Sequence, residues 1–129
     1  MTLLINHRLI DPYDVVVVCV SGGIDSMVML DQLNKLKKTY HLTLIVAHIN
    51  HGIRKESDEE FEFVKQRAEA YGNAFEGLVI RKWPKTNFHD AARKKRYEFF
   101  LSVAKKHNAS KIALAHHLDD QAETILMRL

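Results

Sequence analysis

The chain has 129 residues, of which 47% are hydrophobic and 27% are charged, and this composition is typical of one globular domain. Nineteen Lys and Arg against sixteen Asp and Glu give a net charge of +3, which permits an anionic partner without identifying one. The longest apolar run, residues 15–20, is too short for the roughly 20 residues of a membrane span. The first ten residues lack the basic start and the small-residue cleavage site of a secretory signal, so we expect a cytoplasmic protein without a membrane segment.

Cys19 is the only cysteine among the 129 residues and lies inside that apolar run. One cysteine cannot form an internal disulfide, a four-cysteine zinc site or a paired-cysteine redox motif. We expect Cys19 to be a small, buried hydrophobic side chain.

The first half of the chain alternates between short β-rich runs and longer segments of helical periodicity. The pattern predicts a strand over residues 15–20, a helix over 25–39 and a strand over 42–49. Ser57 and Glu60 have the spacing of a capping box, which is expected to start a second helix. The apolar face of that helix is predicted to carry Phe61, Val64, Ala68 and Tyr71.

The second half continues the alternation after a helix stop at Gly72. It predicts a strand over 74–80, a helix from a cap near Asn87 to about His107, and a strand over 111–116. Asp119 or Asp120 is expected to cap a fourth helix. The apolar side of that helix would carry Ala122, Ile125, Leu126 and Leu129.

This order of elements predicts an α/β fold, a parallel sheet with helices on both faces and right-handed crossovers. The continuous apolar run 15–20 is typical of a strand that is buried on both faces. Ligands of such sheets bind at the carboxyl ends of the strands.

The most informative segment is SGGIDS, residues 21–26, at the turn from the first strand into the first helix. Its glycines allow close backbone approach, and its hydroxyls and amides can bind an anion at the positive end of a helix. No lysine follows at the spacing of the G-x-x-x-x-G-K-[ST] loop, which disfavours γ-phosphoryl transfer. Asp25 beside a phosphate is unfavourable unless Mg²⁺ lies between them. The alternative is a plain glycine turn in which Ser21 and Ser26 cap the helix.

A second segment, residues 116–124, follows the fourth predicted strand and therefore reaches the same edge of the sheet. Asp119 and Asp120 have the carboxylates that hold Mg²⁺ against phosphate oxygens. The alternative is that one aspartate is a helix cap and that Glu123 completes its capping box. His116 and His117 are adjacent and point to opposite faces of a strand, and H-E-x-x-H is absent, so a zinc enzyme is disfavoured.

A third segment, HINHGIR over residues 48–54, follows the second predicted strand to this edge. Gly52 permits close backbone approach, and Arg54 is able to bind a phosphate or a carboxylate. A solvated loop explains these residues equally well.

A fourth segment, residues 91–97, places Arg93 and Arg96 on one face of the third predicted helix. Phe99, Phe100 and Val103 continue the buried stripe of that helix. The charge run is either a solvated face or a contact to phosphate or RNA.

Four segments together resemble the tRNA(Ile)-lysidine synthase family: SGGIDS, HINHGIR, AARKKRYEFF and HHLDDQAETILMRL, in this order over residues 15–129. SGGxDS alone marks the wider PP-loop, or N-type ATP pyrophosphatase, superfamily, whereas HINHGIR with HHLDDQAET is the narrower signal. The resemblance implies a fold similar to adenine-nucleotide alpha hydrolases, formed by one PP-loop ATP pyrophosphatase domain over residues 1–129. It also implies that ATP is attacked at its α-phosphorus, which agrees with the missing lysine.

The reaction implied by the resemblance is the ligation of L-lysine to the wobble cytidine of a CAU-anticodon isoleucine tRNA in the bacterial cytoplasm. The C2 carbonyl oxygen of the cytidine would be adenylated, and the ε-amine of lysine would then displace AMP. ATP and Mg²⁺ would be required, and no membrane would be involved. The sequence carries no signal for the oligomeric state.

The resemblance also implies roles for particular residues. The phosphates of ATP would be held by Ser21, Gly22, Gly23, Ile24, Asp25 and Ser26, with Arg54 as a further nucleotide-binding residue. Asp120 would hold Mg²⁺, with Asp119 and Asp25 as further candidates. Arg93 and Arg96 would contact the nucleotide or the incoming cytidine, and the backbone of Ala47 and His48 would neighbour the adenine.

Lysidine synthases are longer proteins whose later domains help to bind the tRNA, so we expect this chain to correspond to an N-terminal part of such an enzyme. Two other functions remain open at this point. A PP-loop tRNA thiolase would typically need further cysteines for sulfur transfer or a cluster. A nucleotide-binding module without catalysis would not need the aspartate pair.

Overall fold

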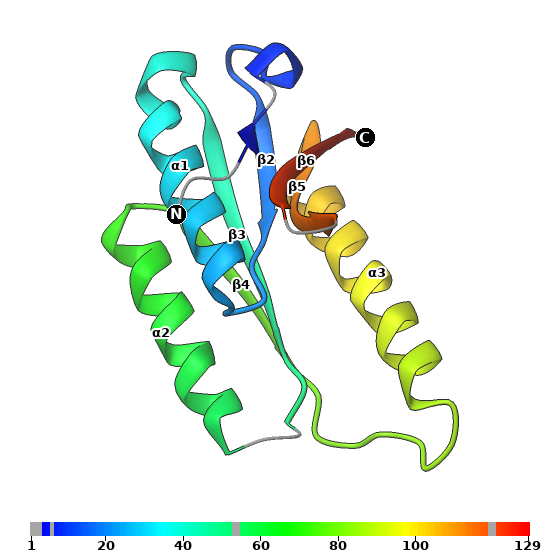
Figure 1. The fold of residues 1–129 in the computed structure, drawn as a ribbon. Coiled ribbons are helices and arrows are strands. Elements are labelled where there is room, and N and C mark those ends of the chain that lie inside the picture. Colours follow the sequence, from blue (N-terminus) through cyan, green and yellow to red (C-terminus); the bar gives the residue numbers. More distant parts are fainter. Residues whose placement is uncertain (1–3, 6, 53–54, 119–120) are drawn as a thin grey trace.

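The computed structural model describes residues 4–5, 7–52, 55–118 and 121–129. These residues form a six-stranded sheet and three helices (Figure 1). The strands are β1 (Leu4–Ile5), β2 (Val15–Cys19), β3 (Thr43–Asn50), β4 (Ala74–Val79), β5 (Lys111–Leu118) and β6 (Gln121–Arg128). The helices are α1 (Ile24–Tyr40), α2 (Glu56–Ala70) and α3 (Phe88–Lys106), with a short 3₁₀ turn at His7–Leu9. The strand order is β1-β6-β5-β2-β3-β4.

Strand β2 lies at the centre of the sheet and is parallel to both of its neighbours, β3 and β5. Val17 is aligned with Ile45 on one side and with Ile112 on the other. Strand β4 continues the parallel arrangement beyond β3. The four predicted strands and their parallel arrangement are therefore confirmed.

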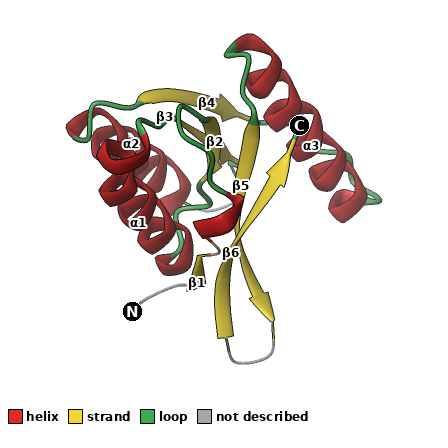
Figure 2. Cartoon of the chain, turned by 90° about the horizontal axis from the view of Figure 1, so that it is seen from above, coloured by secondary structure: helices red, strands yellow, loops and turns green. Residues whose placement is uncertain are grey.

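Helices cover both faces of this sheet, as Figure 2 shows: α1 and α2 lie on one side and α3 on the other. Alternate residues of β2 face opposite layers, because successive side chains of a strand point to opposite faces. Val16 and Val18 pack in the layer of α1 and α2, whereas Val17 and Cys19 pack with Phe100 of α3. The α/β fold class and the buried position of Cys19 are confirmed. None of the described helices is long and apolar enough to cross a membrane.

The prediction of a fourth helix after residue 120 is wrong. Residues 121–128 form β6, which pairs antiparallel with β5 and places Ile125 opposite Leu114. This pairing satisfies the backbone hydrogen bonds along the edge of β5, and it buries Thr124 and Leu126 on one face of the new strand. Apolar spacing in this segment fits a helix, but the β-branched Thr124 and Ile125 also fit a strand, and pairing with an available edge decided between them. The sheet is consequently mixed and only mostly parallel.

The capping box predicted at the start of the second helix is also wrong. Lys55 already has helical backbone angles, with φ −59° and ψ −36°, so α2 begins earlier and Ser57 is a buried residue of its first turn. The acidic residues of that turn interact favourably with the positive end of the helix dipole and so stabilise the start of α2. The predicted apolar face is confirmed by Val64 and Ala68, which are fully buried. Helix α3 begins next to Asn87, as predicted, although the Asn87 side chain forms no cap bond.

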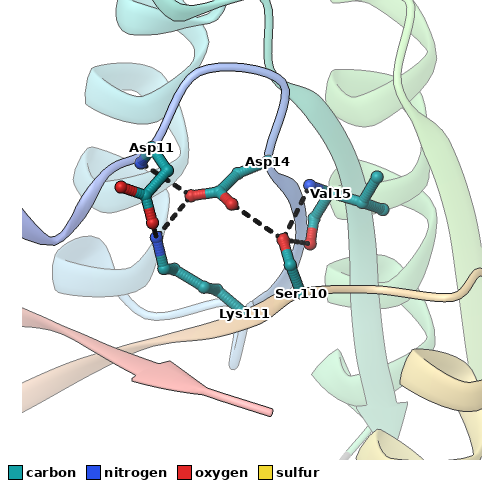
Figure 3. A network of polar contacts seen from close by, with 5 residues as sticks. All are labelled: Asp11, Asp14, Val15, Ser110 and Lys111. Atoms are coloured by element: carbon teal, nitrogen blue, oxygen red, sulfur yellow. Dashed lines mark hydrogen bonds and ion pairs between the residues drawn. The ribbon is translucent and has the colours of Figure 1, made fainter.

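A polar cluster around the buried Asp14 and Lys111 ties the start of β2 to β5 at the amino-terminal edge of the sheet (Figure 3). The Lys111 ammonium lies 2.7 Å from Asp11 and 2.5 Å from Asp14, and the Ser110 hydroxyl donates to Asp14 at 2.9 Å. Burial disfavours the charged carboxylate, but bonds from Lys111, the Asp11 amide and Ser110 outweigh it and hold the pKa of Asp14 below its ordinary value. Burial likewise opposes the charge of Lys111, yet its two carboxylate partners raise its pKa. These contacts hold the end of the sheet that lies opposite the predicted site.

Candidate functional site

The carboxyl ends of β2, β3 and β5 meet at one edge of the sheet, and the SGGIDS loop joins β2 to α1 there. The Ser21 amide donates to the Ser26 hydroxyl at 3.2 Å, and the two hydroxyl oxygens are 3.1 Å apart. The Ser26 hydroxyl donates to the Gly23 carbonyl at 3.0 Å, and the Gly23 amide donates to Ser21 Oγ at 3.3 Å. The loop's own hydroxyls thus hold its backbone in shape. Amides of the first turn of α1 have no acceptor within the helix, so they face this edge as anion donors.

Gly22 has a left-handed backbone with φ +93°, which other residues adopt only at a cost. A Cβ at this position would lie 3.3 Å from Glu60 Oε2 and 3.6 Å from His48 Cε1. Glu60 of α2 and His48 of β3 therefore pack directly against the loop.

His48 is 2% exposed and packs between the end of β2 and the glycine loop. Its Nδ1–H donates to the carbonyl of Val20 at 2.6 Å, the residue immediately before the loop. Burial lowers the pKa of His48, although the Val20 carbonyl and the charge of Glu60 act in the opposite direction. The imidazole is therefore neutral at pH 7. Ala47 is fully buried, and its carbonyl accepts the Val20 amide at 2.9 Å.

A pocket opens beside the loop at the end of β3. It is lined by Ser21 from the loop, by residues 48–51, and by Ser57 and Glu60 of α2. The sequence pattern assigned Ser57 and Glu60 to a helix cap and did not predict that they line a pocket. A signal was available, because the first turn of a helix that follows β3 must start at the carboxyl edge of that strand.

In the middle of the HINHGIR segment, the Asn50 side chain holds the turn at Gly52. Asn50 accepts the Gly52 amide at 2.8 Å and donates to Asp58 of α2 at 2.7 Å. Gly52 has φ +67°, and a Cβ there would lie 2.6 Å from the Ile80 carbonyl oxygen. The predicted close approach at Gly52 is thus present, but the chain's own backbone makes it. Arg54 lies outside the described residues.

Strand β5 reaches the same edge, as predicted, through a contact between His117 and Asp25. His117 Nδ1 and Asp25 Oδ2 are 3.1 Å apart, and both side chains remain partly exposed. Asp119 and Asp120 lie outside the described residues, so their proposed role in holding Mg²⁺ stays a prediction. Within the described part of the chain, no three His, Cys, Asp or Glu side chains gather as a metal site.

Arg93 and Arg96 lie on the exposed first half of α3, and both guanidinium groups lie near the Tyr97 ring, at 5.7 and 5.8 Å. Burial first, and then the charges of Arg96 and His48, lower the pKa of His51. Burial raises the pKa of Cys19 to about 12, so this thiol is unreactive at neutral pH.

These features define a class: a nucleotide-binding α/β protein whose glycine loop follows the central strand and has no phosphate-clamping lysine. A family model described as "PP-loop domain" matches residues 3–129, and the chain belongs to this family. Membership supports the use of ATP.

Two similar proteins are named tRNA(Ile)-lysidine synthase. The protein from Thermosipho africanus is 42% identical over 129 residues, which cover 96% of this chain and 30% of that protein. The protein from Geobacter sulfurreducens is 45% identical over 130 residues, which cover 96% of this chain and 27% of that protein. The chain thus spans less than a third of the length of these two relatives.

A solved structure, the U34-tRNA thiolase NcsA from Methanococcus maripaludis, has a similar fold. Its TM-score is 0.70 at 19% sequence identity, covering 83% of this chain and 39% of the thiolase. This likeness concerns the fold alone.

Proposed function

We propose that the protein is an ATP-dependent ligase of the cytoplasm that joins L-lysine to C2 of the wobble cytidine in CAU-anticodon tRNA(Ile). The observation that carries the proposal is the similarity, over 96% of the chain, to proteins named tRNA(Ile)-lysidine synthase. The ordered SGGIDS loop at the carboxyl edge of the sheet supports it, because that loop is where a nucleotide would bind.

In this proposal, residues 21–26 hold the phosphates of ATP, and the amides of the first turn of α1 are the main donors. The hydroxyls of Ser21 and Ser26 hold the loop in shape, and Gly22 supplies the left-handed backbone of its turn. The backbone of Ala47 and His48 neighbours the adenine, and Arg54 adds a positive charge. No lysine follows the loop at the spacing of a phosphate-clamping residue, which disfavours γ-phosphoryl transfer, and the family resemblance implies attack at the α-phosphorus with loss of pyrophosphate.

The side chains at this edge fit Mg²⁺ in one respect: Asp25 offers a carboxylate oxygen beside the anion-binding loop. Asp120 and Asp119 would complete the set of oxygen ligands. When bound, the ion neutralises phosphate charge. Arg93 and Arg96 contact the nucleotide or the cytidine from α3.

The chemistry needs two displacements. The C2 carbonyl oxygen of the cytidine attacks the α-phosphorus, and pyrophosphate leaves. The uncharged ε-amine of lysine then attacks C2, loses a proton, and AMP leaves with the former carbonyl oxygen. Activation is needed because that oxygen is a poor leaving group at neutral pH, and the protein contributes positioning and charge neutralisation.

The test is incorporation of labelled lysine into CAU-anticodon tRNA(Ile) by the complete encoded protein, with ATP and Mg²⁺ and with a wobble-uridine tRNA as control. Incorporation with release of AMP, absent from the control, is expected. Asp120→Ala should abolish it, whereas Glu62→Ala, an exposed carboxylate of α2, should leave it unchanged. AMP release without incorporation would indicate another PP-loop enzyme such as a thiolase, and the absence of both would indicate a non-catalytic module. A fully active Asp120→Ala protein would refute the role of that residue.

A further inference from the structure

Positive charge is concentrated in one segment between β4 and the middle of α3. Residues 81–96 hold seven of the nineteen Lys and Arg but only one acidic residue, Asp90. The whole chain has a net charge of only +3, so the remaining residues are net negative. A charge distribution this uneven is the electrostatic signature of a surface for an anionic polymer.

The basic side chains of this segment are exposed. The exposed basic residues are Arg81, Lys82, Lys85 and residues 93–96. The neighbouring Tyr97 is also exposed, at 48%. Figure 1 shows that the connection from β4 to α3 and the first turns of α3 extend beyond the carboxyl end of the sheet. We name residues 81–96 the basic edge.

Aromatic contacts fix the basic edge beside the candidate site. The Trp83 indole N–H donates to the His51 carbonyl at 2.7 Å, and the two rings are stacked with centroids 5.7 Å apart. Phe88, the first residue of α3, packs edge-on against Trp83 at 4.8 Å. His51 also lines the pocket next to Ser21. Through its contact with His51, Trp83 therefore places the basic edge next to the pocket.

We propose that the basic edge binds the sugar-phosphate backbone of the RNA substrate and holds the anticodon arm over the carboxyl end of the sheet. The inference rests on the proposed function, and it assigns a surface to the tRNA that the proposed function leaves unplaced. Exposed lysines and arginines neutralise phosphates, and exposed Tyr97 offers a ring on which an unpaired base can stack.

The test compares two triple variants of the complete encoded protein by filter binding of CAU-anticodon tRNA(Ile) at several salt concentrations. Lys82→Gln, Lys85→Gln and Lys95→Gln remove charge from the basic edge. Lys35→Gln, Lys38→Gln and Lys105→Gln remove the same charge from exposed positions of α1 and the last turn of α3. Affinity for ATP is measured for both and should equal that of the wild type.

The basic-edge variant is expected to bind tRNA on the order of tenfold more weakly, and its salt slope should fall by about two, since each lost phosphate contact removes roughly 0.7–0.9. The control should match the wild type. Equal tRNA affinity in the two variants would overturn the proposal, as would wild-type protein that binds acidic phospholipid vesicles but no tRNA. If the wild type incorporates lysine and the basic-edge variant binds tRNA normally, the surface is refuted while the proposed function stands. If tRNA binding depends on the basic edge but no lysine is incorporated, the surface stands and the proposed function fails.

Discussion

Replacement of His48 tests how the chain holds the glycine loop in shape. His48→Leu removes the 2.6 Å bond to the Val20 carbonyl, at a position that is 2% exposed. A buried carbonyl that loses its donor costs about 1–3 kcal/mol, so we expect the free energy of unfolding to fall by about 2 kcal/mol. His48→Asn offers a matched control, because the Asn Nδ2 is the same number of bonds from Cβ as the His Nδ1. This variant should regain about half of that loss, with the remainder due to the smaller side chain and the cavity it leaves.

Urea unfolding gives the free energies, and equilibrium titration gives the affinity for ATP. Since Val20 directly precedes the loop, His48→Leu should also weaken ATP binding more than His48→Asn does. A leucine variant that is as stable as the asparagine variant and binds ATP equally well would refute the supporting role of His48.

A comparison of the wild type with the His48→Asn variant tests a dependence of stability on pH. The pKa of His48 is lowered in the folded state, so below its ordinary value of 6.5 the unfolded chain takes up a proton that the folded chain resists. The wild type should therefore lose stability as the pH falls below 6.5, in addition to any loss shared with the His48→Asn variant. Identical slopes of stability against pH in the two proteins would contradict the buried, neutral state of this imidazole.

Three further changes concern the frame around the site, each measured by urea unfolding. Gly52→Ala should cost about 2 kcal/mol or more, from a positive φ and a Cβ 2.6 Å from the Ile80 carbonyl oxygen, and a wild-type value would refute that packing. Gly77→Ala should cost about 1–3 kcal/mol, because its Cβ would lie 2.5 Å from the Phe61 ring. Lys111→Met should cost about 3 kcal/mol by leaving Asp14 buried without its ammonium partner. In the wild type, Asp14 contributes to the free energy of unfolding above about pH 3.8, and this contribution is lost as the pH falls further. Lys111 contributes below about pH 10.5, and its contribution is lost as the pH rises through its raised folded pKa. A Lys111→Met protein with the wild-type pH profile would contradict both assignments.

The central features of the fold follow from local sequence patterns. The run of valines at 15–18 is typical of a strand buried on both faces, and the glycine turn after such a strand is expected at the carboxyl edge of the sheet. The predicted meeting of β2, β3 and β5 at one edge is confirmed by the contact of His117 with Asp25 and of His48 with Val20.

The errors arose where tertiary contacts decided the outcome. Apolar spacing after residue 120 fits a helix as well as a strand, and only the available edge of β5 selects the strand. Glu60 has the spacing of a capping residue, and the packing of α2 against Gly22 directs it to the pocket instead. The link between Trp83 and His51 joins residues 32 positions apart, and no periodicity reveals such a contact.

The most direct test of the proposed function is transfer of label from ATP to RNA. The complete encoded protein is incubated with Mg²⁺, CAU-anticodon tRNA(Ile) and ATP labelled at the α-phosphate, first without lysine. We expect labelled AMP to accumulate on the tRNA and to be discharged as free AMP when lysine is added. Absence of label from the tRNA, or an RNA-bound label that lysine does not discharge, would contradict the proposal.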